Sequence, residues 1–212
     1  MLRWGYKRVT VEEVAKRAGI GKGTVYLHFR SRTWLFVCVL GRESLQVVDA
    51  LVAAIERDAT AALISEQVRL TYLEVQRRPL LRALFTRDHE VLGELVRGSD
   101  ADPVRDRRGE LAADLFRLLR EHELMRTDLD VTAQMHVVGA VQTGFYLHHP
   151  ALGSAEDAAA ALRHTVHAAV EPPDPDPDAL TAVAPLVRGR YRDFRASVAE
   201  ALTDPDPREE PR

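Results

Sequence analysis

The sequence predicts an all-α fold, in which a short N-terminal helix-turn-helix precedes an antiparallel helical body. No stretch sustains the alternation of apolar and polar residues that marks a half-buried strand. Apolar residues instead recur at helical spacing among Ala, Leu, Glu and Arg, which favour helices. Glycine and proline residues divide the chain into segments of helix length, so every regular element is expected to be a helix.

The first helices are predicted from their caps. Residues 10–13, Thr-Val-Glu-Glu, fit a capping box that opens a helix, and Gly19 suits the positive φ that ends one. A second helix is expected over about 22–29, and a long third helix, capped by Ser31, over 31–55. The small core expected between the first two helices consists of Val14, Ala15, Ile20, Val25 and Phe29.

The rest of the chain is divided by its proline and glycine residues. Further helices are expected over about 60–77, 80–97, 104–125, 131–148, 155–169 and 185–202. Residues 171–177 hold four prolines, and proline fixes φ and lacks an N–H donor, so this segment is expected to be an extended spacer. The charged end after residue 203 is expected to be disordered.

Charge and cysteine content narrow the class of protein. Residues 1–42 hold nine Lys and Arg against Glu12 and Glu13, a formal charge of +7, which leaves −10 for the rest of a chain whose total is −3. A basic end on an acidic body indicates a module that binds a polyanion. Cys38, the only cysteine, allows no intrachain disulfide, and its apolar surroundings predict a core filler. No secretion signal or membrane span is visible, so a cytoplasmic protein is expected.

The segment from Val9 to Phe36 carries the motif on which the functional interpretation depends. It reads V-T-V-E-E-V-A-K-R-A-G-I-G-K-G-T-V-Y-L-H-F-R-S-R-T-W-L-F, two short helices joined by a tight turn and followed by a long helix. In a helix-turn-helix the second helix enters the major groove of DNA. The small residues over 21–24 allow the backbone to approach DNA, and the neighbouring side chains are then available to phosphates or base edges.

This segment resembles the signature of the tetracycline-repressor (TetR) family, most specifically in the run K-G-T-V-Y-L-H-F followed by S-R. The resemblance implies a ligand-responsive transcriptional regulator, a repressor that a small, mainly apolar effector releases from a palindromic operator. It implies a homodimer that needs no cofactor. The DNA contacts that it implies are Thr10 and Arg32 on phosphates, and Lys22, Gly23, Thr24, Tyr26 and His28 on the recognition helix.

The resemblance predicts that the chain is divided into three parts. Residues 1–42 are predicted to be the DNA-binding domain, 43–170 the effector-binding and dimerisation domain, and 171–212 a spacer, an amphipathic helix and a disordered end. The effector is expected to contact Tyr72, Phe85, Phe116, Gln142 and Tyr146, aromatic and amide groups that suit an apolar site with polar anchors. Ordinary core packing explains these aromatic residues nearly as well. The helices over 131–148 and 155–169 are expected to form the dimer.

The sequence departs from the family pattern at two places. Gly21 stands where the family commonly has a serine or threonine cap. Only four residues precede Gly5-Tyr6, where the family places a whole helix, so a natural start upstream of Met1 is one expectation. A second function therefore stays open, that of a dimeric protein that binds small molecules and has lost DNA binding.

Catalytic and metal-binding motifs are not visible in the sequence. An enzyme needs a nucleophile with its base, paired carboxylates or a phosphate-binding glycine loop, and none is recognisable, so the protein is not expected to be an enzyme. His164 and His167 lie one turn apart, but no further ligand joins them in sequence, and no metal site is expected.

Overall fold

The computed structural model describes residues 9–29, 31–86, 103–148 and 153–203, and all regular structure in these ranges is helical. The predicted all-α fold is therefore confirmed. In chain order the helices are α2 (Val11–Ala18), α3 (Lys22–His28), α4 (Arg32–Arg57), the 3-10 helix η1 (Ala59–Ala62), α5 (Ile64–Gln76), α6 (Pro79–Phe85), α8 (Pro103–Glu121), α9 (Val131–His148), α10 (Ala155–Val170) and α11 (Pro177–Thr203). None of these helices is both long and apolar enough to cross a membrane.

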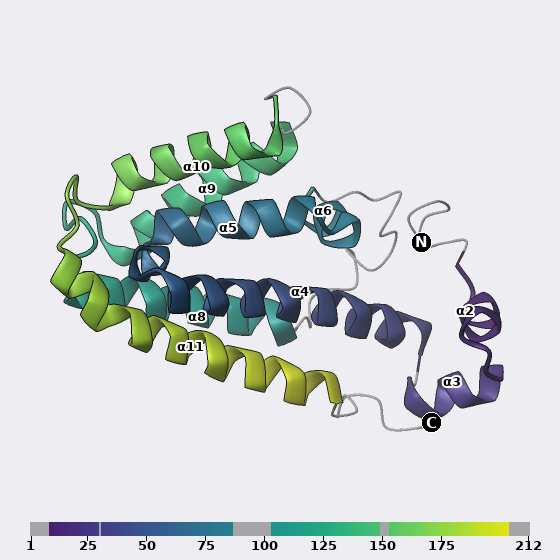
Figure 1. Ribbon diagram of the computed structural model, residues 1–212. Helices are drawn as coiled ribbons and strands as arrows, with labels where there is room; N and C mark the ends of the chain where they lie inside the picture. Colours follow the sequence, from purple (N-terminus) through teal and green to yellow (C-terminus); the bar gives the residue numbers. More distant parts are fainter. Residues whose placement is uncertain (1–8, 30, 87–102, 149–152, 204–212) are drawn as a thin grey trace.

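The helices of the body lie in layers around α4 (Figure 1). Helix α5 packs on α4 and is itself covered by α10, while α11 runs along α4 and α8 on the opposite side. Helices α2 and α3 lie beyond the first turns of α4, away from these layers. The apolar cores follow the same division: one large cluster fills the body, and a small separate cluster joins α2 and α3 to the start of α4. We call α2 and α3 the head and the helices from η1 to α11 the body. Helix α4 is thus the element that the head and the body share.

Helices α4 and α11 run antiparallel along their whole contact. Leu202, near the end of α11, packs against Gly41, where a Cβ atom would collide with the leucine side chain. Farther along, Arg195 donates to Asp49 at 2.6 Å and Arg192 donates to Glu56 at 2.6 Å. Since these ion pairs are exposed, the buried apolar residues of α11 supply most of its attachment to the body.

Two buried polar groups fasten the ends of the body helices. Glu171, which follows α10 and is 2% exposed, accepts hydrogen bonds of 2.7 Å from both the backbone N–H and the hydroxyl of Ser65 at the start of α5. Nδ1 of His167 lies 2.9 Å from the same carboxylate. In α11, the Tyr191 hydroxyl donates to the Gln67 amide at 2.6 Å, and burial raises the pKa of Tyr191. These contacts satisfy groups that would be costly to bury unpaired.

The structure corrects three predicted helix boundaries. The helix expected over 60–77 is two elements, because Leu63 adopts an extended conformation between η1 and α5. Residues 104–125 do not form one helix to their end, since α8 stops at Glu121 and Glu123 takes a positive φ of 61°. The spacer prediction is wrong for Pro177, which is the first residue of α11, and Pro185 lies inside that helix.

Other predictions concern residues that the structure leaves undescribed or a boundary that it does not decide. Of the helix expected over 80–97, the structure describes α6, and residues 87–97 lie outside the described ranges. Residues 1–8 and 204–212 also lie outside them. The predicted domain boundary at residue 42 falls inside the continuous helix α4 and stays a prediction. Cys38 is half-buried where α4 meets the end of α11, with its Sγ atom 3.7 Å from the Leu202 carbonyl.

Candidate nucleic-acid interface and effector site

The start of α2 is fixed by a capping box. The backbone N–H of Glu13 donates to Thr10 Oγ1 at 3.2 Å, and the N–H of Thr10 donates to Glu13 Oε2 at 3.1 Å. At the other end, Gly19 takes a φ of 71°, the left-handed conformation that a glycine adopts at low cost. Both features are local, which is why the sequence predicts these boundaries correctly. Thr10 is exposed at the start of the helix.

Helices α2 and α3 cross over a small core, in which Ala15 and Val25 are each 3% exposed. Val11 and Leu35 complete this core, and Val14 and Phe29 pack against its edge. The prediction that Ile20 belongs to it is wrong, because Ile20 is 44% exposed. Ile20 follows the left-handed turn at Gly19, and its N–H donates to the Ala15 carbonyl while its side chain faces solvent.

All five residues of α3 that are expected to contact DNA lie on its exposed surface. Lys22, Gly23, Thr24, Tyr26 and His28 are exposed. A Cβ atom at Gly23 would meet nothing within 4 Å, so the backbone there is open to a partner. Gly21 precedes the helix as its N-cap and makes no side-chain hydrogen bond. The first N–H groups of α3 are thus left for another acceptor such as a phosphate.

Lys22 is engaged with a carboxylate of the preceding helix. Its ammonium forms an ion pair with Glu12, and its Nζ atom lies 5.9 Å from the centre of the Tyr26 ring. The hydrogen bond between the two charged groups lowers the pKa of Glu12 and raises the pKa of Lys22. Both groups are charged near neutral pH, and a phosphate contact by Lys22 requires exchange of this carboxylate for a phosphate.

Leu27 is an exposed residue of α3 that the sequence analysis missed. Its side chain is 83% exposed, between Tyr26 and His28, and it is not a member of the small core of α2 and α3. The available signal was its position two residues after Val25, which places it on the opposite side of the helix. If α3 enters the major groove as the sequence predicts, an exposed leucine there suits an apolar contact such as the methyl group of thymine.

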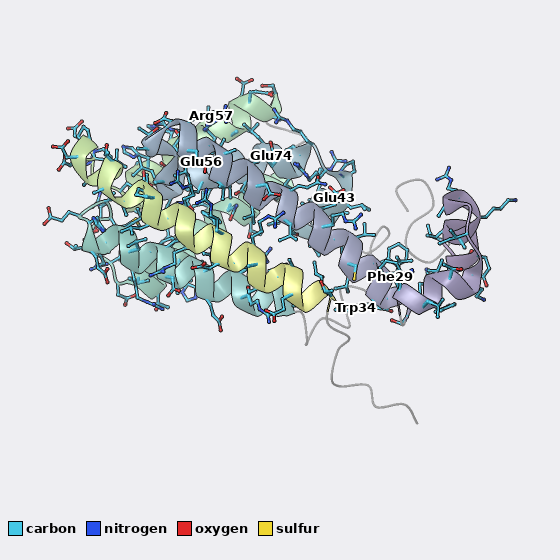
Figure 2. The ribbon with its side chains drawn as sticks, turned by 60° about the horizontal axis from the view of Figure 1, so that its bottom comes forward. Phe29, Trp34, Glu43, Glu56, Arg57 and Glu74 are labelled. Atoms are coloured by element: carbon cyan, nitrogen blue, oxygen red, sulfur yellow. The ribbon has the colours of Figure 1, made fainter. Side chains whose placement is uncertain are left out.

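Arg32, the other residue expected to contact a phosphate, is less exposed than Thr10. Arg32 is half-buried at the first turn of α4, and its guanidinium carbon lies 5.8 Å from the centre of the Phe36 ring. Ser31 caps this helix by accepting a hydrogen bond of 3.0 Å from the N–H of Trp34. Figure 2 shows Phe29 and Trp34 where α3 meets α4, so Arg32 lies at the junction between the head and the body.

In the body, three of the five predicted effector residues form one aromatic cluster. The rings of Tyr72 and Tyr146 stack with their centroids 5.3 Å apart, and the Phe85 ring lies 4.6 Å from that of Tyr146. Gln142 is half-buried one turn from Tyr146. Phe116 is 4% exposed within the body core, and no ring contact in the described part of the chain joins it to the cluster.

The electrostatics of this cluster follow from its burial. Burial raises the pKa of Tyr146 far above its ordinary value, and the nearby Gln142 amide offsets only part of that rise. Burial also raises the pKa of Tyr72, with the Gln76 amide acting in the opposite direction. Both phenols are therefore neutral in the physiological range and can donate or accept hydrogen bonds.

Helix α9 presents an uncharged face to solvent. None of its 18 residues is Asp, Glu, Lys or Arg, which is unusual for a helix with an exposed side. Leu147 is 56% exposed on it. The exposed residues of α9 recur at helical spacing and are Thr132, His136, Gly139, Ala140, Thr143 and Leu147, with Ala160, Ala161, His164 and Ala168 exposed on the neighbouring α10.

The head matches a known family. Residues 3–38 match the family of "Bacterial regulatory proteins, tetR family". The helix-turn-helix segment of the chain is therefore similar to that of TetR-family regulators. The matched segment contains α2, the turn and α3, the elements whose caps and core are described above.

Two curated proteins of this kind are similar to the chain. The HTH-type transcriptional repressor KstR of Mycobacterium tuberculosis (strain ATCC 25618 / H37Rv) is 34% identical over 106 residues, which cover 47% of this chain and 46% of KstR. The HTH-type transcriptional repressor BepR of Brucella suis biovar 1 (strain 1330) is 27% identical over 122 residues, 55% of this chain and 56% of BepR. The matched region thus spans about half the length of these relatives. No solved structure shows significant similarity to the chain.

Proposed function

We propose that this protein is a TetR-family transcriptional repressor that binds a palindromic DNA operator as a homodimer and leaves it when a small, mainly apolar effector binds the body. The observation that carries the proposal is the exposed outer face of α3, held on its own small core at the end of α4. The similarity to proteins named as transcriptional repressors supports it. Such a regulator acts where the chromosome lies, in the bacterial cytoplasm.

The proposed dimer forms through the uncharged face of α9 and the adjacent face of α10. Small residues such as Gly139 and Ala140 allow two helices to approach closely, and Leu147 supplies an apolar side chain that solvent would otherwise surround. A two-fold axis through this face uses the same patch on both protomers. Two heads held in this way match two half-sites one helical turn apart.

The proposed coupling between the effector and DNA passes through α6. Phe85, at its end, contacts the ring of Tyr146, so a molecule that enters the cluster displaces this end of α6. Just before the other end of α6, the side chain of Arg78 bonds to Glu74 of α5, and its Nε atom lies 3.6 Å from a carboxylate oxygen of Glu43 on α4. A shift of α6 therefore acts on α4, which continues into the head, and favours a spacing of recognition helices that no longer fits DNA.

Binding to duplex DNA tests the proposal through its salt dependence. Lys22→Ala is expected to weaken binding to all duplexes about equally and to lower the slope of log affinity against log salt by about 0.9, because one phosphate contact is lost. The matched control is Arg117→Ala, which removes an exposed charge from the body. Binding that is independent of salt would contradict the proposal. Failure to shift any duplex, including the region upstream of its own gene, would favour the small-molecule-binding protein without DNA binding.

Removing the carboxylate that engages Lys22 should have the opposite effect. Glu12→Gln is expected to raise affinity for duplex DNA several-fold, because Lys22 no longer exchanges one anion for another and a negative charge leaves the interface. Fluorescence anisotropy at low and high salt measures the change, with Glu121→Gln on the body as the control. An unchanged affinity would show that Lys22 does not lie at the DNA.

Leu27 is expected to read a thymine methyl group. Leu27→Ala should reduce the preference for thymine at one position of each half-site by roughly five- to tenfold, in line with the usual cost of one mismatched base pair, and leave affinity for the substituted site nearly unchanged. Competition between duplexes that carry thymine or uracil at each position checks this, since uracil lacks only the methyl group. Equal loss of affinity at every position would rule out a specific contact.

A further inference from the structure

Gln76, the last residue of α5, carries a buried amide that the proposed function does not yet use. Both its Nε2 and its Oε1 atoms are inaccessible to solvent, and neither has a hydrogen-bond partner in the described part of the chain. The hydroxyl oxygen of Tyr146, a residue that is 2% exposed, is also buried and also has no hydrogen-bond partner among the described residues. Because both amide atoms are unpaired, this observation does not depend on which of them is nitrogen.

These unpaired atoms border the same aromatic rings. Gln76 lies one helical turn after Tyr72, and its amide is near enough to the Tyr72 hydroxyl to lower the pKa of that phenol, although no hydrogen bond of normal geometry joins the two groups. The Tyr72 ring stacks on Tyr146, and the Tyr146 ring contacts Phe85. The amide and the hydroxyl therefore belong to the aromatic cluster of Tyr72, Phe85 and Tyr146.

Unpaired buried polar atoms are rare in folded proteins. More than nine in ten buried polar groups of the backbone, and most of those of side chains, have a hydrogen-bond partner. A buried group without one has lost its hydrogen bonds to water and has gained none in exchange. Three unpaired atoms beside one group of rings therefore indicate a partner that the described part of the chain does not provide. Apolar surface and unpaired polar groups together are the usual composition of a site for a small molecule.

We propose that Gln76 is a specificity residue of the effector site, and that it recognises a carboxamide or lactam attached to an aromatic or other apolar group. This inference rests on the proposed function, because it names the chemistry of the molecule that the body senses. The Gln76 amide offers one donor and one acceptor side by side, and a carboxamide or lactam offers the complementary pair. The apolar part then lies against the rings, and the Tyr146 hydroxyl pairs with a remaining polar atom.

Other ligand chemistries match these atoms less well. A hydrocarbon leaves all three polar atoms unpaired. A carboxylate accepts hydrogen bonds but donates none, so it leaves Oε1 of Gln76 unpaired. An alcohol satisfies either amide atom but does not hold both in the parallel arrangement of a lactam edge.

Three probes of similar size test the inference: benzamide, benzoate and toluene, each titrated into the full chain and followed by NMR chemical shifts. Wild type is expected to bind benzamide at least tenfold more tightly than toluene or benzoate, the usual effect of one buried hydrogen bond. Gln76→Leu is expected to abolish this preference while toluene affinity stays within about twofold. Tyr146→Phe, which removes a single hydroxyl, should weaken benzamide binding alone and serves if the first variant does not fold. Gln46→Leu, at an exposed position of α4, is the matched control.

The outcomes separate this inference from the proposed function. Equal affinity for the three probes, or the same preference for benzamide in Gln76→Leu, would overturn the role of Gln76. Absence of binding by every probe would also overturn it, and a raised melting temperature in Gln76→Leu would then indicate that water alone occupies the site. Binding to duplex DNA is measured separately, without probes. If the chain binds no duplex, the proposed regulator function fails, but a preference for benzamide still supports the role of Gln76 in binding a small molecule.

Discussion

Ala140→Glu is expected to turn the dimer into monomers and to lower affinity for a palindromic duplex by about 100-fold or more. Ala140 lies on the exposed, uncharged face of α9, where the proposed interface brings the same residues of two protomers together. A carboxylate there is desolvated without a partner and faces a second one across the axis. Each head then binds its half-site alone, and the gain from linking two binding modules, typically 10²–10⁴, is lost.

Light scattering during size-exclusion chromatography measures the mass, and anisotropy measures the affinity. Ala53→Glu is the matched control, because it places the same side chain at an exposed position of α4 outside the proposed interface. This control should remain dimeric and bind DNA as wild type does. A dimer that persists in Ala140→Glu would show that another surface joins the protomers.

Glu171→Ala is expected to cost about 2–5 kcal/mol of stability, a large part of the 5–15 kcal/mol typical of a folded domain. The substitution removes the acceptor of two short hydrogen bonds and leaves the Ser65 hydroxyl and backbone N–H buried and unpaired. Each such group costs about 1–3 kcal/mol. The start of α5 and the end of α10 lose their attachment together, so the body is expected to loosen at this end.

Urea denaturation followed by circular dichroism measures the loss. Glu171→Gln keeps the shape and an acceptor oxygen but not the charge, and is expected to lose less than Glu171→Ala. Glu121→Ala, at an exposed position in the last turn of α8, should change stability by no more than about 0.5 kcal/mol. Equal stability of Glu171→Ala and the exposed control would contradict this account of the buried carboxylate.

Features of the fold that depend on local chemistry were predictable from the sequence. The caps at Thr10, Gly19 and Ser31 depend on side chains within three residues of the helix end, and all three lie where the sequence predicts them. The continuation of α11 through Pro185 was not predictable from local rules. Pro185 and Thr181, whose carbonyl the proline leaves without its helical donor, are both exposed, so water can satisfy that carbonyl.

Contacts between distant segments were harder to predict, and the candidate sites show this. The sequence identifies Tyr72, Phe85 and Tyr146 by residue type, and only the fold brings their rings together. Phe116 has the same residue type but packs elsewhere in the core. The exposure of Ile20 and Leu27 and the unpaired amide of Gln76 depend on what does or does not surround them, which a sequence pattern does not contain.

Selection from a pool of random duplexes tests the central claim most directly. The purified chain is incubated with the pool at about 0.15 M salt, bound duplexes are recovered and sequenced, and the cycle is repeated with the Lys22→Ala variant in parallel. The account predicts enrichment of an inverted repeat whose half-sites are centred about one helical turn, 10 base pairs, apart, with weaker recovery by the variant. Recovery of no sequence above the starting pool, or of a single half-site without a repeat, would contradict a dimeric DNA-binding regulator.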